Sequence, residues 1–503
     1  IDCAVYRING SPITLVGFEI TKDTAPAVIV GGNSKRMYDL ALLDGRIEFN
    51  STNGDPAVQN DPQTGLYIHD VYVKNASTLV KSGSFASVQG GSGWNRIIEY
   101  AAADGLEGYN MVKPNGTAWQ HVRDQVVSKE SCTEGQVPTN FISRHIWDTA
   151  DFPSPDDHFD RANADGNPYD ADEYVVCGDA NGVDERELLP GESEKDVDKG
   201  PDCRPGLQAL IDTPGCKYIL LPNGIFFIKK SPSGDYGIQL RANTTLLGMN
   251  ATEIRTHADW NPTSETPMIT TVDSASAASK MAFLELIYVY RETPNASPVE
   301  KYDWFSGYHW KAGVNSLTRG IEVRPIHLNG GLPTQDKANV KYLGNAGGRH
   351  YGNGAAKPVS KDGSGGFRRL RVTGASNPLA FYNWNTEDNM DKPQSEVISS
   401  ENVIFYGTKA EDDFPLQFTN SENIAVIGMG GRTGLTISNC TDILAGVICA
   451  KYPPSHDGYA PLREPGIGTF PNGSTVGLYK RGTFDWDAVK IIPEMPDDDP
   501  LGP

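Results

Sequence analysis

The sequence predicts an all-β protein, a right-handed parallel β-helix (a solenoid of stacked coils) in two halves joined by an acidic linker. Two observations lead to this fold class: a strand pattern that returns near the C-terminal end, and a composition suited to many turns. The 503 residues include 53 Gly and 34 Pro, and 38% are hydrophobic. Such a composition favours short strands over long helices, in a chain large enough for a sizeable core.

Three short segments carry the returning pattern, which reads apolar, variable, apolar, polar, Asn. They are residues 377–383, 414–420 and 433–439. A period-two strand that ends on asparagine and returns at a stacking interval is typical of a parallel solenoid. We therefore expect two inward rows and one corner stack, which are Leu379, Leu416 and Leu435; Phe381, Phe418 and Ile437; and Asn383, Asn420 and Asn439.

A row of glycines gives a second register for the same fold. Gly407, Gly428 and Gly446 each end a strand at similar intervals. Glycine adopts positive φ at little cost, so these positions predict one corner of successive coils. The alternative fold is an ordinary antiparallel sandwich.

The organisation along the chain follows from composition. Residues 1–145 alternate short strands with turns and form the first β-helical half, which reads as N-terminally incomplete. Residues 146–200 are an acidic linker or insertion rich in Pro and Gly. Residues 201–485 form the second β-helix with an N-terminal capping helix, and 486–503 are an acidic tail.

Charge and hydropathy limit the partners. The net charge of −20 makes nucleic acid or an anionic membrane an unfavourable partner. It also disfavours a strongly anionic polymer unless a local basic patch overrides it. No segment approaches the ~20 apolar residues of a membrane span, so we expect no membrane contact.

Cysteines and glycosylation sequons predict a secreted, extracellular protein. The seven cysteines include no CxxC pair, which argues against zinc, and Cys203/Cys216 and Cys440/Cys449 could each close a local loop. A corner asparagine such as Asn439, buried in a stack, could not carry a glycan. The predicted glycosylation sites are Asn50, Asn75, Asn115, Asn243, Asn250, Asn295 and Asn472. Chance sequons in an Asn-rich β protein are the alternative.

The segment from Cys203 resembles a known superfamily. A short helix, then "LPNGIFFI", then "IQLRANTTLLGMNATEI" resembles the opening of the pectate-lyase-like right-handed β-helix superfamily. The segment from "NPLAFYNWNTEDN" to "NSENIAVIGMGG" resembles its late coils. Two halves joined by a linker are similar to glycoside hydrolase family 55, the β-1,3-glucanases. The resemblance implies a helix that plugs the first coil and, for family 55, inverting cleavage with a glutamate as general acid.

Acidic residues beside the late coils are candidates for glycoside hydrolysis, which commonly uses two carboxyl groups. Sugar rings would stack on neighbouring aromatic side chains. The alternative is that these are polar turn residues of an acidic protein. The catalytic candidates are Glu387, Asp388, Glu411 and Asp413, and the aromatic candidates are Tyr382 and Trp384.

Two further functions remain open. A polysaccharide lyase needs a base and a cation that neutralises a uronate carboxylate, and Arg369 and Arg371 form a basic patch beside a His350/Tyr351 pair. The alternative for these arginines is pairing with the acidic surface. A non-catalytic matrix, sheath or filament protein would instead self-associate. The sequence predicts polysaccharide as the partner, with no cofactor and no metal.

Overall fold

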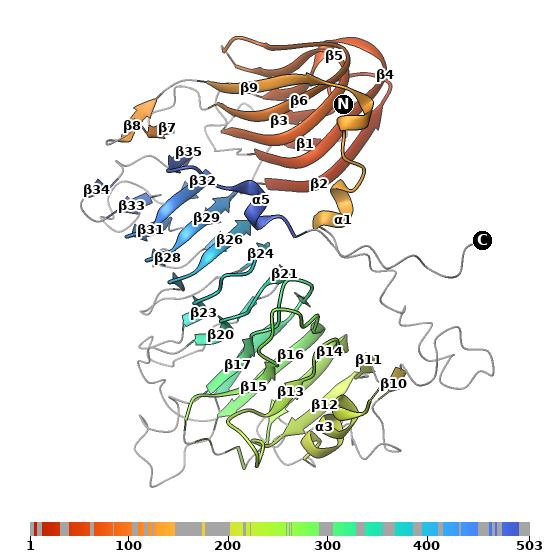
Figure 1. Ribbon diagram of the computed structural model, residues 1–503, viewed down its shortest axis with the longest axis vertical. Helices are drawn as coiled ribbons and strands as arrows, with labels where there is room; N and C mark the ends of the chain where they lie inside the picture. The colour runs from red at the N-terminus through yellow and green to blue at the C-terminus, as the bar shows by residue number, and fades with distance from the viewer. Residues whose placement is uncertain are drawn as a thin grey trace, which may run out of the picture. The chain divides into compact units, whose positions relative to one another are not determined.

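The computed structural model consists mainly of parallel strands (Figure 1). It divides into two compact units. Unit 1 comprises 1–148, 403–411 and 420–503, and unit 2 comprises 149–402 and 412–419. The structure describes residues 5–7, 13–30, 40–60, 65–83, 85–102, 109–114, 119–122, 125–145, 174–176, 202–214, 218–221, 223–257, 259–260, 262, 264–290, 305–327, 338–352, 354–355, 368–385, 395–410, 416–431, 434–450, 462–464, 468–469 and 475–491.

Unit 2 is built from two sheets, whose strands alternate along the chain and pair in parallel with the coil before and after. Its first sheet contains β10 (Tyr174–Val176), β11 (Tyr218–Leu220), β12 (Gly224–Ile228), β14 (Thr245–Thr256), β16 (Lys280–Tyr290), β18 (Leu317–Arg319), β19 (Glu322–His327), β21 (Gly348–Tyr351), β22 (Gly354–Ala355) and β24 (Leu379–Tyr382). Its second sheet contains β13 (Ile238–Leu240), β15 (Thr266–Thr271), β17 (Phe305–Trp310), β20 (Ala338–Leu343), β23 (Arg368–Thr373), β25 (Glu396–Ile398) and β28 (Leu416–Thr419).

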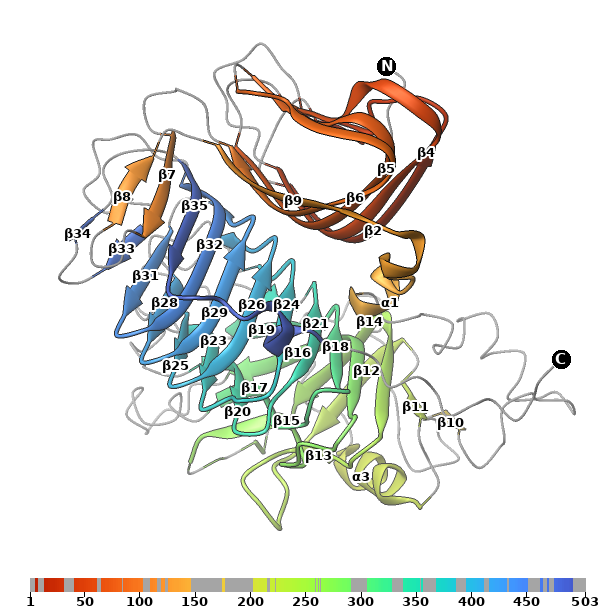
Figure 2. The ribbon, with the colours of Figure 1, turned by 45° about the horizontal axis from the view of Figure 1, so that its top comes forward.

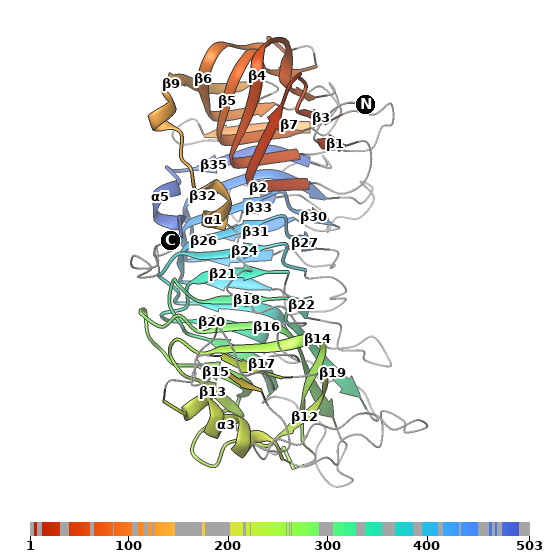
Figure 3. The ribbon, with the colours of Figure 1, turned by 90° about the vertical axis from the view of Figure 1, so that its right-hand side faces the viewer.

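Parallel register from coil to coil makes unit 2 a parallel β-helix (Figure 3). Alternate residues of each strand point inward, and the inward members of β17 and β20, such as Tyr308, Trp310 and Tyr342, are fully buried. Large apolar side chains stacked between the sheets exclude water from the core. The predicted all-β class and its parallel β-helix are therefore confirmed.

The predicted alignment of the three repeats is wrong in its first member. Leu379 lies on β24, which pairs with β21, whereas Leu416 lies on β28, which pairs with β25 in the other sheet. Asn383 therefore ends a strand of a different sheet from Asn420. The same pattern occurs at both corners because both need a left-handed residue, so it does not reveal which sheet a strand joins. All six predicted inward residues are buried.

The corners consist of residues with positive φ, stacked by backbone hydrogen bonds. In unit 2, Gly344, Gly374 and Ser399 form one such column, with φ of 57°, 64° and 49°. In unit 1, Asn420 and Asn439 have φ of 51° and 52°, and the Asn420 N–H donates to the Ser438 carbonyl at 3.0 Å. Both asparagines are exposed, which corrects the expectation of a buried stack, because their side chains point away from the core.

The capping helix is also present. Helix α3 (Arg204–Asp212) buries Leu207 and Ile211. Its Gln208 pairs with the backbone of Gln239 on the first strand of the second sheet: Nε2 donates to the carbonyl at 3.0 Å, and Oε1 accepts the N–H at 2.9 Å. The helix thus satisfies backbone groups that a terminal strand would leave unpaired.

The N-terminal part of unit 1 is a stack of strands that run in parallel, of which β4 and β5 are the longest. They are β1 (Val5–Arg7), β2 (Ile13–Lys22), β3 (Val28–Val30), β4 (Leu40–Asn60) and β5 (Leu66–Ser82). Ile13 aligns with Leu40, and Leu40 with Leu66. Strands β6 (Val88–Ala102) and β9 (Val126–Cys132) then add antiparallel, and Figure 2 shows how strongly β4 and β5 curve.

Unit 1 also contains the late coils. Their strands are β26 (Glu401–Tyr406), β27 (Lys409–Ala410), β29 (Glu422–Ile427), β30 (Gly430–Gly431), β31 (Leu435–Ser438), β32 (Thr441–Ala450), β33 (Leu462–Glu464) and β34 (Gly468–Thr469). Strand β35 (Thr475–Arg481) pairs antiparallel with β32 and parallel with β7 (Tyr109–Pro114), which forms a hairpin with β8 (Trp119–Val122). The short helices are η1 (Glu134–Gln136), α1 (Phe141–His145) and α5 (Trp486–Val489).

The predicted glycine corner lies in these late coils and contacts the N-terminal strands. Gly407 and Gly428 have φ of 66° and 76°, but the third left-handed residue is Val447 (φ 56°) rather than Gly446. A Cβ on Gly428 would lie 1.7 Å from Thr14 Oγ1 on β2, whereas one on Gly407 would lie 3.8 Å from Thr14 Cβ. Gly428 therefore allows β2 to approach closely as well as allowing the turn.

The predicted disulfides are not formed. Cys203 and Cys440 are both buried and form no disulfide. Cys440 points into the core at a coil corner, where its Sγ contacts the Ser438 carbonyl. Strand β32 separates it from Cys449, and each strand residue advances by about 3.3 Å, too far for a disulfide to close across so many residues.

Two other predictions, the linker and the acidic tail, concern segments of which the structure describes only a small part. Of the proposed linker 146–200, the structure describes only Tyr174–Val176. The division into two halves and its boundaries therefore stay predictions. Helix α5 occupies the start of the segment predicted as an acidic tail.

Candidate functional site

The best-defined candidate site is a row of polar side chains on the second sheet of unit 2. Strand register aligns one residue from each coil. We call this set the polar row, and its members in order are Gln239, Thr270, His309, Lys341, Arg371, Glu396 and Gln417. Neighbouring strands are about 4.8 Å apart, so adjacent members are within reach of each other.

Period-two alternation explains why the row faces away from the core. His309 lies between Tyr308 and Trp310, Lys341 between Val340 and Tyr342, and all four flanking side chains are fully buried. The buried neighbours fix the strand orientation, so the intervening polar residue must point to the opposite face. The row is nevertheless largely covered, since the side chains of His309 and Lys341 are 13% and 9% exposed.

Three side chains meet at the centre of the row: its members His309 and Lys341, and Glu265, which lies beside them. Glu265 directly precedes β15, and its carboxylate pairs with the Lys341 ammonium. His309 Nε2 lies 3.8 Å from Glu265 Oε1, beyond hydrogen-bond distance. This buried nitrogen has no hydrogen-bond partner within the described residues. An unsatisfied buried ring nitrogen is unusual and is a group that a ligand could engage.

The next coils add a second ion pair. Arg371 Nε pairs with the Glu396 carboxylate, and their side chains are 21% and 5% exposed. The charges across successive coils therefore run from Glu265 and the neutral His309 through two adjacent cations to Glu396. Two cations on neighbouring strands repel each other, and the flanking carboxylates offset that repulsion.

The environment assigns a charge state to each central group. Burial lowers the pKa of His309 below its usual 6.5, and the nearby Glu265 only partly opposes this. Burial alone would raise the pKa of Glu265, but His309 and Lys341 outweigh it and hold that pKa at about 2. At neutral pH the site therefore contains a neutral imidazole beside a carboxylate that stays ionised.

This arrangement suits proton abstraction. A neutral imidazole with an unpaired nitrogen can accept a proton, and the adjacent carboxylate stabilises the resulting imidazolium. Glu265 cannot act as a general acid at neutral pH, because its pKa of about 2 keeps it deprotonated. Lys341 and Arg371 are suited to binding an anionic group. Among the described residues, no three His, Cys, Asp or Glu side chains gather as a metal site.

The sequence identified one member of this row. Arg371 was predicted as part of a basic patch, with pairing to acidic groups as the alternative; it pairs with Glu396 and is largely covered. Arg369 lies on β23, and its side chain is outside the described set. His309 and Lys341 were missed, although a charged residue between two bulky apolar ones recurs in Tyr308-His309-Trp310, Val340-Lys341-Tyr342 and Leu370-Arg371-Val372.

The remaining predicted residues do not form a site in the described chain. Glu387, Asp388, Glu411 and Asp413 lie outside the described residues. Trp384 is fully buried, so the prediction that it stacks on sugar is wrong: after the turn at Asn383 its ring enters the core beside Phe381. Tyr382 is half-buried, and its ring stacks on that of Tyr351 with the centroids 4.7 Å apart.

His350 is also part of the core. It is fully buried, with its Nδ1 2.8 Å from Thr318 Oγ1, and burial lowers its pKa to about 3. Its contacts with Tyr342 and Phe381 belong to the stacked interior. A histidine surrounded by core side chains in this way cannot reach a polymer outside the coil.

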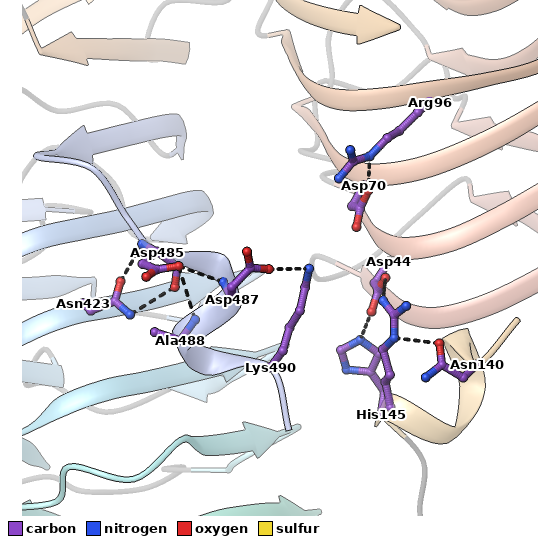
Figure 4. A network of polar contacts seen from close by, with 11 residues as sticks. Asp44, Asp70, Arg96, Asn140, His145, Asn423, Asp485, Asp487, Ala488 and Lys490 are labelled. Carbon is purple, nitrogen blue, oxygen red and sulfur yellow. Dashed lines mark hydrogen bonds and ion pairs between the residues drawn. The ribbon is translucent and has the colours of Figure 1, made fainter. Parts of the chain in front are cut away.

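A second polar cluster lies in unit 1 and fastens helix α1 to the N-terminal strands (Figure 4). Asp44 Oδ1 accepts from Arg144 Nη1 at 2.9 Å, and Asp44 Oδ2 lies 2.7 Å from His145 Nε2. Burial opposes ionisation, yet His145 and Arg144 hold the pKa of Asp44 below its usual value. One coil on, Asp70 accepts from Arg96 at 2.5 Å.

The left side of the same view shows α5 fixed to the late coils (Figure 4). Asp485 caps the helix by accepting from the N–H groups of Asp487 and Ala488. Its own backbone N–H donates to Asn423 Oδ1 at 2.7 Å. The Trp486 ring stacks on the half-buried His69 ring, with the ring centroids 3.8 Å apart. Because these polar groups pair with one another, the cluster holds unit 1 together and leaves the polar row as the candidate site.

Comparisons with known proteins give only distant likenesses. No protein-family profile and no curated protein matches the chain. Among solved structures, it is similar to the A-module of mannuronan C-5 epimerase AlgE4 from Azotobacter vinelandii, with 12% identity, 55% of this chain and 91% of that chain covered, and a TM-score of 0.27. The AlgE6 A-module from the same organism is 13% identical, with 55% of this chain and 88% of that chain covered and a TM-score of 0.27.

The catalytic domain of a GH87 α-1,3-glucanase in complex with nigerose is also similar. The two chains are 10% identical, the alignment covers 75% of this chain and 85% of that chain, and the TM-score is 0.18. At such low TM-scores the likeness says nothing about the site. The fold assignment rests on the strand register described above. Within the described residues, no helix is long and apolar enough to cross a membrane.

Proposed function

We propose that this protein acts on an acidic extracellular polysaccharide, by removing the proton from the sugar carbon next to a carboxylate. The observation that carries the proposal is His309. Its imidazole is neutral at neutral pH, and its buried Nε2 has no hydrogen-bond partner within the described residues. A general base needs both properties, a free electron pair and a pKa that leaves it unprotonated.

The neighbours of His309 have complementary roles. Lys341 and Arg371 would neutralise the sugar carboxylate, which makes the adjacent C–H more acidic and stabilises the negative charge that develops. Glu265 would stabilise the imidazolium once the proton has moved. Arg371 is the more exposed of the two cations, at 21% against 9% for Lys341, so the polymer would contact it first.

The overall charge makes these two cations necessary. A protein with a net charge of −20 repels an anionic polymer. Attraction must therefore be local, at Lys341 and Arg371. The abundant sequons and the acidic composition support secretion as part of the proposal.

Glycoside hydrolysis of a neutral chain such as β-1,3-glucan is the second candidate. Its predicted carboxylates lie outside the described residues. Glu265, the carboxylate beside His309 and Lys341, has a pKa of about 2 and cannot donate a proton at neutral pH. The described contacts therefore favour proton abstraction over acid-assisted hydrolysis.

The test incubates the full chain with alginate, pectate and laminarin. Elimination from a uronate leaves a conjugated, ultraviolet-absorbing product, whereas hydrolysis releases reducing ends without one. We expect absorbing product from a polyuronate and none from laminarin. Reducing ends from laminarin alone would favour the hydrolase, and self-association with no product from any polymer would favour a structural protein.

Two histidine variants make the test specific. His309→Gln removes the base and should lower turnover roughly 100- to 10,000-fold. The matched control is His257→Gln, because His257 is 14% exposed and lies 3.6 Å from Asp259, much as His309 lies beside Glu265. The control should keep full activity. Equal activity of both variants would exclude His309 as the base.

A further inference from the structure

We infer that Asn439 carries an N-linked oligosaccharide in the secreted protein and that Asn75 does not. This reverses the sequence-based expectation at both positions. It rests on the proposed secretion and is independent of the proposed chemistry, because neither residue lies in the polar row. The observations concern the accessibility and the hydrogen bonds of each sequon.

Asn439 is well placed to accept a glycan. It has a φ of 52° at the corner between β31 and β32 and is exposed, as is Thr441 two residues later. The side chain makes no hydrogen bond within the described residues, so its amide is available. The sequon reads Asn439-Cys440-Thr441, and only the central Cys440 points into the core.

Asn75 is occupied by structural hydrogen bonds. Its Nδ2 donates to the Phe49 carbonyl at 2.8 Å, and its Oδ1 accepts the Gly93 N–H at 3.2 Å. A glycan on Nδ2 would have to displace the first bond and would crowd the second. Each such bond to a partly buried group contributes about 1 kcal/mol, and leaving its partner unsatisfied costs more. The folded coil therefore excludes a glycan here.

The chemical step is a glycosyl transfer. Asn439 Nδ2 would bond to C1 of the first sugar of a lipid-linked oligosaccharide diphosphate. The bond between C1 and the phosphate oxygen breaks, the lipid diphosphate leaves, and the amide loses one proton. The glycan would project from the corner, where its bulk would keep a second chain from packing against these coils.

One coil earlier lies a matched position without a sequon. Asn420 has a φ of 51° and is exposed, and Glu422 is aligned with Thr441 in the sheet. Glu422 is itself exposed. The substitution Glu422→Thr would therefore create a sequon that begins at Asn420, at an equivalent corner and without disturbing the core.

The experiment expresses the full chain behind a signal peptide in a eukaryotic host and measures occupancy of each sequon by peptide mass spectrometry. We expect a glycan at Asn439, none at Asn75, loss of the Asn439 glycan in Thr441→Ala, and a new glycan at Asn420 in Glu422→Thr. An unmodified Asn439 would overturn the inference, whether or not the exposed Asn50 is modified. Occupied Asn75 in folded, secreted chain, or an empty Asn420 in Glu422→Thr, would refute the geometric reasoning behind it.

The glycan occupancy of each sequon is measured independently of activity on polyuronates. Secreted, glycosylated protein that leaves polyuronates unchanged would contradict the proposed chemistry alone. Active protein with a bare Asn439 would contradict the inference alone.

Discussion

Substitution of Gly428 by alanine tests whether the glycine corner exists for the turn alone or also for the approach of β2. Gly407 is the matched control, because it occupies the same corner one coil earlier. Both residues have positive φ, at 76° and 66°. They differ in their surroundings: a Cβ on Gly428 would lie 1.7 Å from Thr14 Oγ1, whereas one on Gly407 would meet Thr14 Cβ at an ordinary 3.8 Å.

The magnitude follows from these two terms. A left-handed conformation costs an L-residue about 1–2 kcal/mol, and this cost lowers the stability of both variants. Forcing a methyl group into a filled space costs a further 1–3 kcal/mol or so, which applies to Gly428→Ala alone. We therefore expect Gly428→Ala to destabilise the contact with β2 by about 1–3 kcal/mol more than Gly407→Ala, or roughly 5- to 150-fold in the opening equilibrium.

Hydrogen exchange read by mass spectrometry can measure this opening locally. Amides of β2 should lose protection in Gly428→Ala by that factor beyond any loss in Gly407→Ala. Adding Thr14→Ala to Gly428→Ala removes the clashing hydroxyl and should restore most of the protection that β2 loses. Equal loss of protection in the two glycine variants would show that the corner serves only the turn and would refute the reasoning.

The remaining predictions concern the polar row and the capping helix. Lys341→Met leaves the Glu265 charge without its partner and should lower the free energy of unfolding by about 3–5 kcal/mol, measured by urea denaturation; adding Glu265→Gln should recover most of it, and no recovery would show that packing rather than charge is lost. The pKa of Glu265 is lowered from 4.5 to about 2, so its contribution is complete above pH 4.5 and is lost as the pH falls toward 2; Glu265→Gln should flatten that part of the stability curve, and an unchanged acid slope would contradict the assignment. Gln208→Ala removes two hydrogen bonds to the Gln239 backbone and should cost about 1–3 kcal/mol, seen as faster exchange of the Gln239 amide; Gln208→Glu keeps the acceptor and should protect that amide, so exchange as fast as in the alanine variant would argue against the capping role.

The fold could be predicted because its periodic features are local. Inward residues such as Phe418 and Ile437 alternate with polar ones, and glycine or asparagine occurs where the backbone must turn left-handed. The pattern did not say which of the two sheets a strand joins, because both corners impose the same conformation. The misplacement of Asn383 on the Asn420 corner follows from that ambiguity.

The candidate site was harder to predict because it depends on register between distant coils. Glu265, His309 and Lys341 are far apart in the sequence and come together only when three coils stack. The carboxylates that are adjacent in the sequence, such as Glu387 and Asp388, lie outside the described residues. The exposure of single side chains could not be predicted either. Trp384 follows a corner residue, a position that suggests a surface side chain, yet it is fully buried.

Incubation in deuterium oxide with a polyuronate tests the central claim most directly. Abstraction of the proton next to the sugar carboxylate must either leave an unsaturated product or return deuterium to that carbon from the solvent. The account predicts one of these two outcomes with the native chain and neither with His309→Gln. Cleavage that yields only saturated, undeuterated sugars, or native behaviour of His309→Gln, would contradict it.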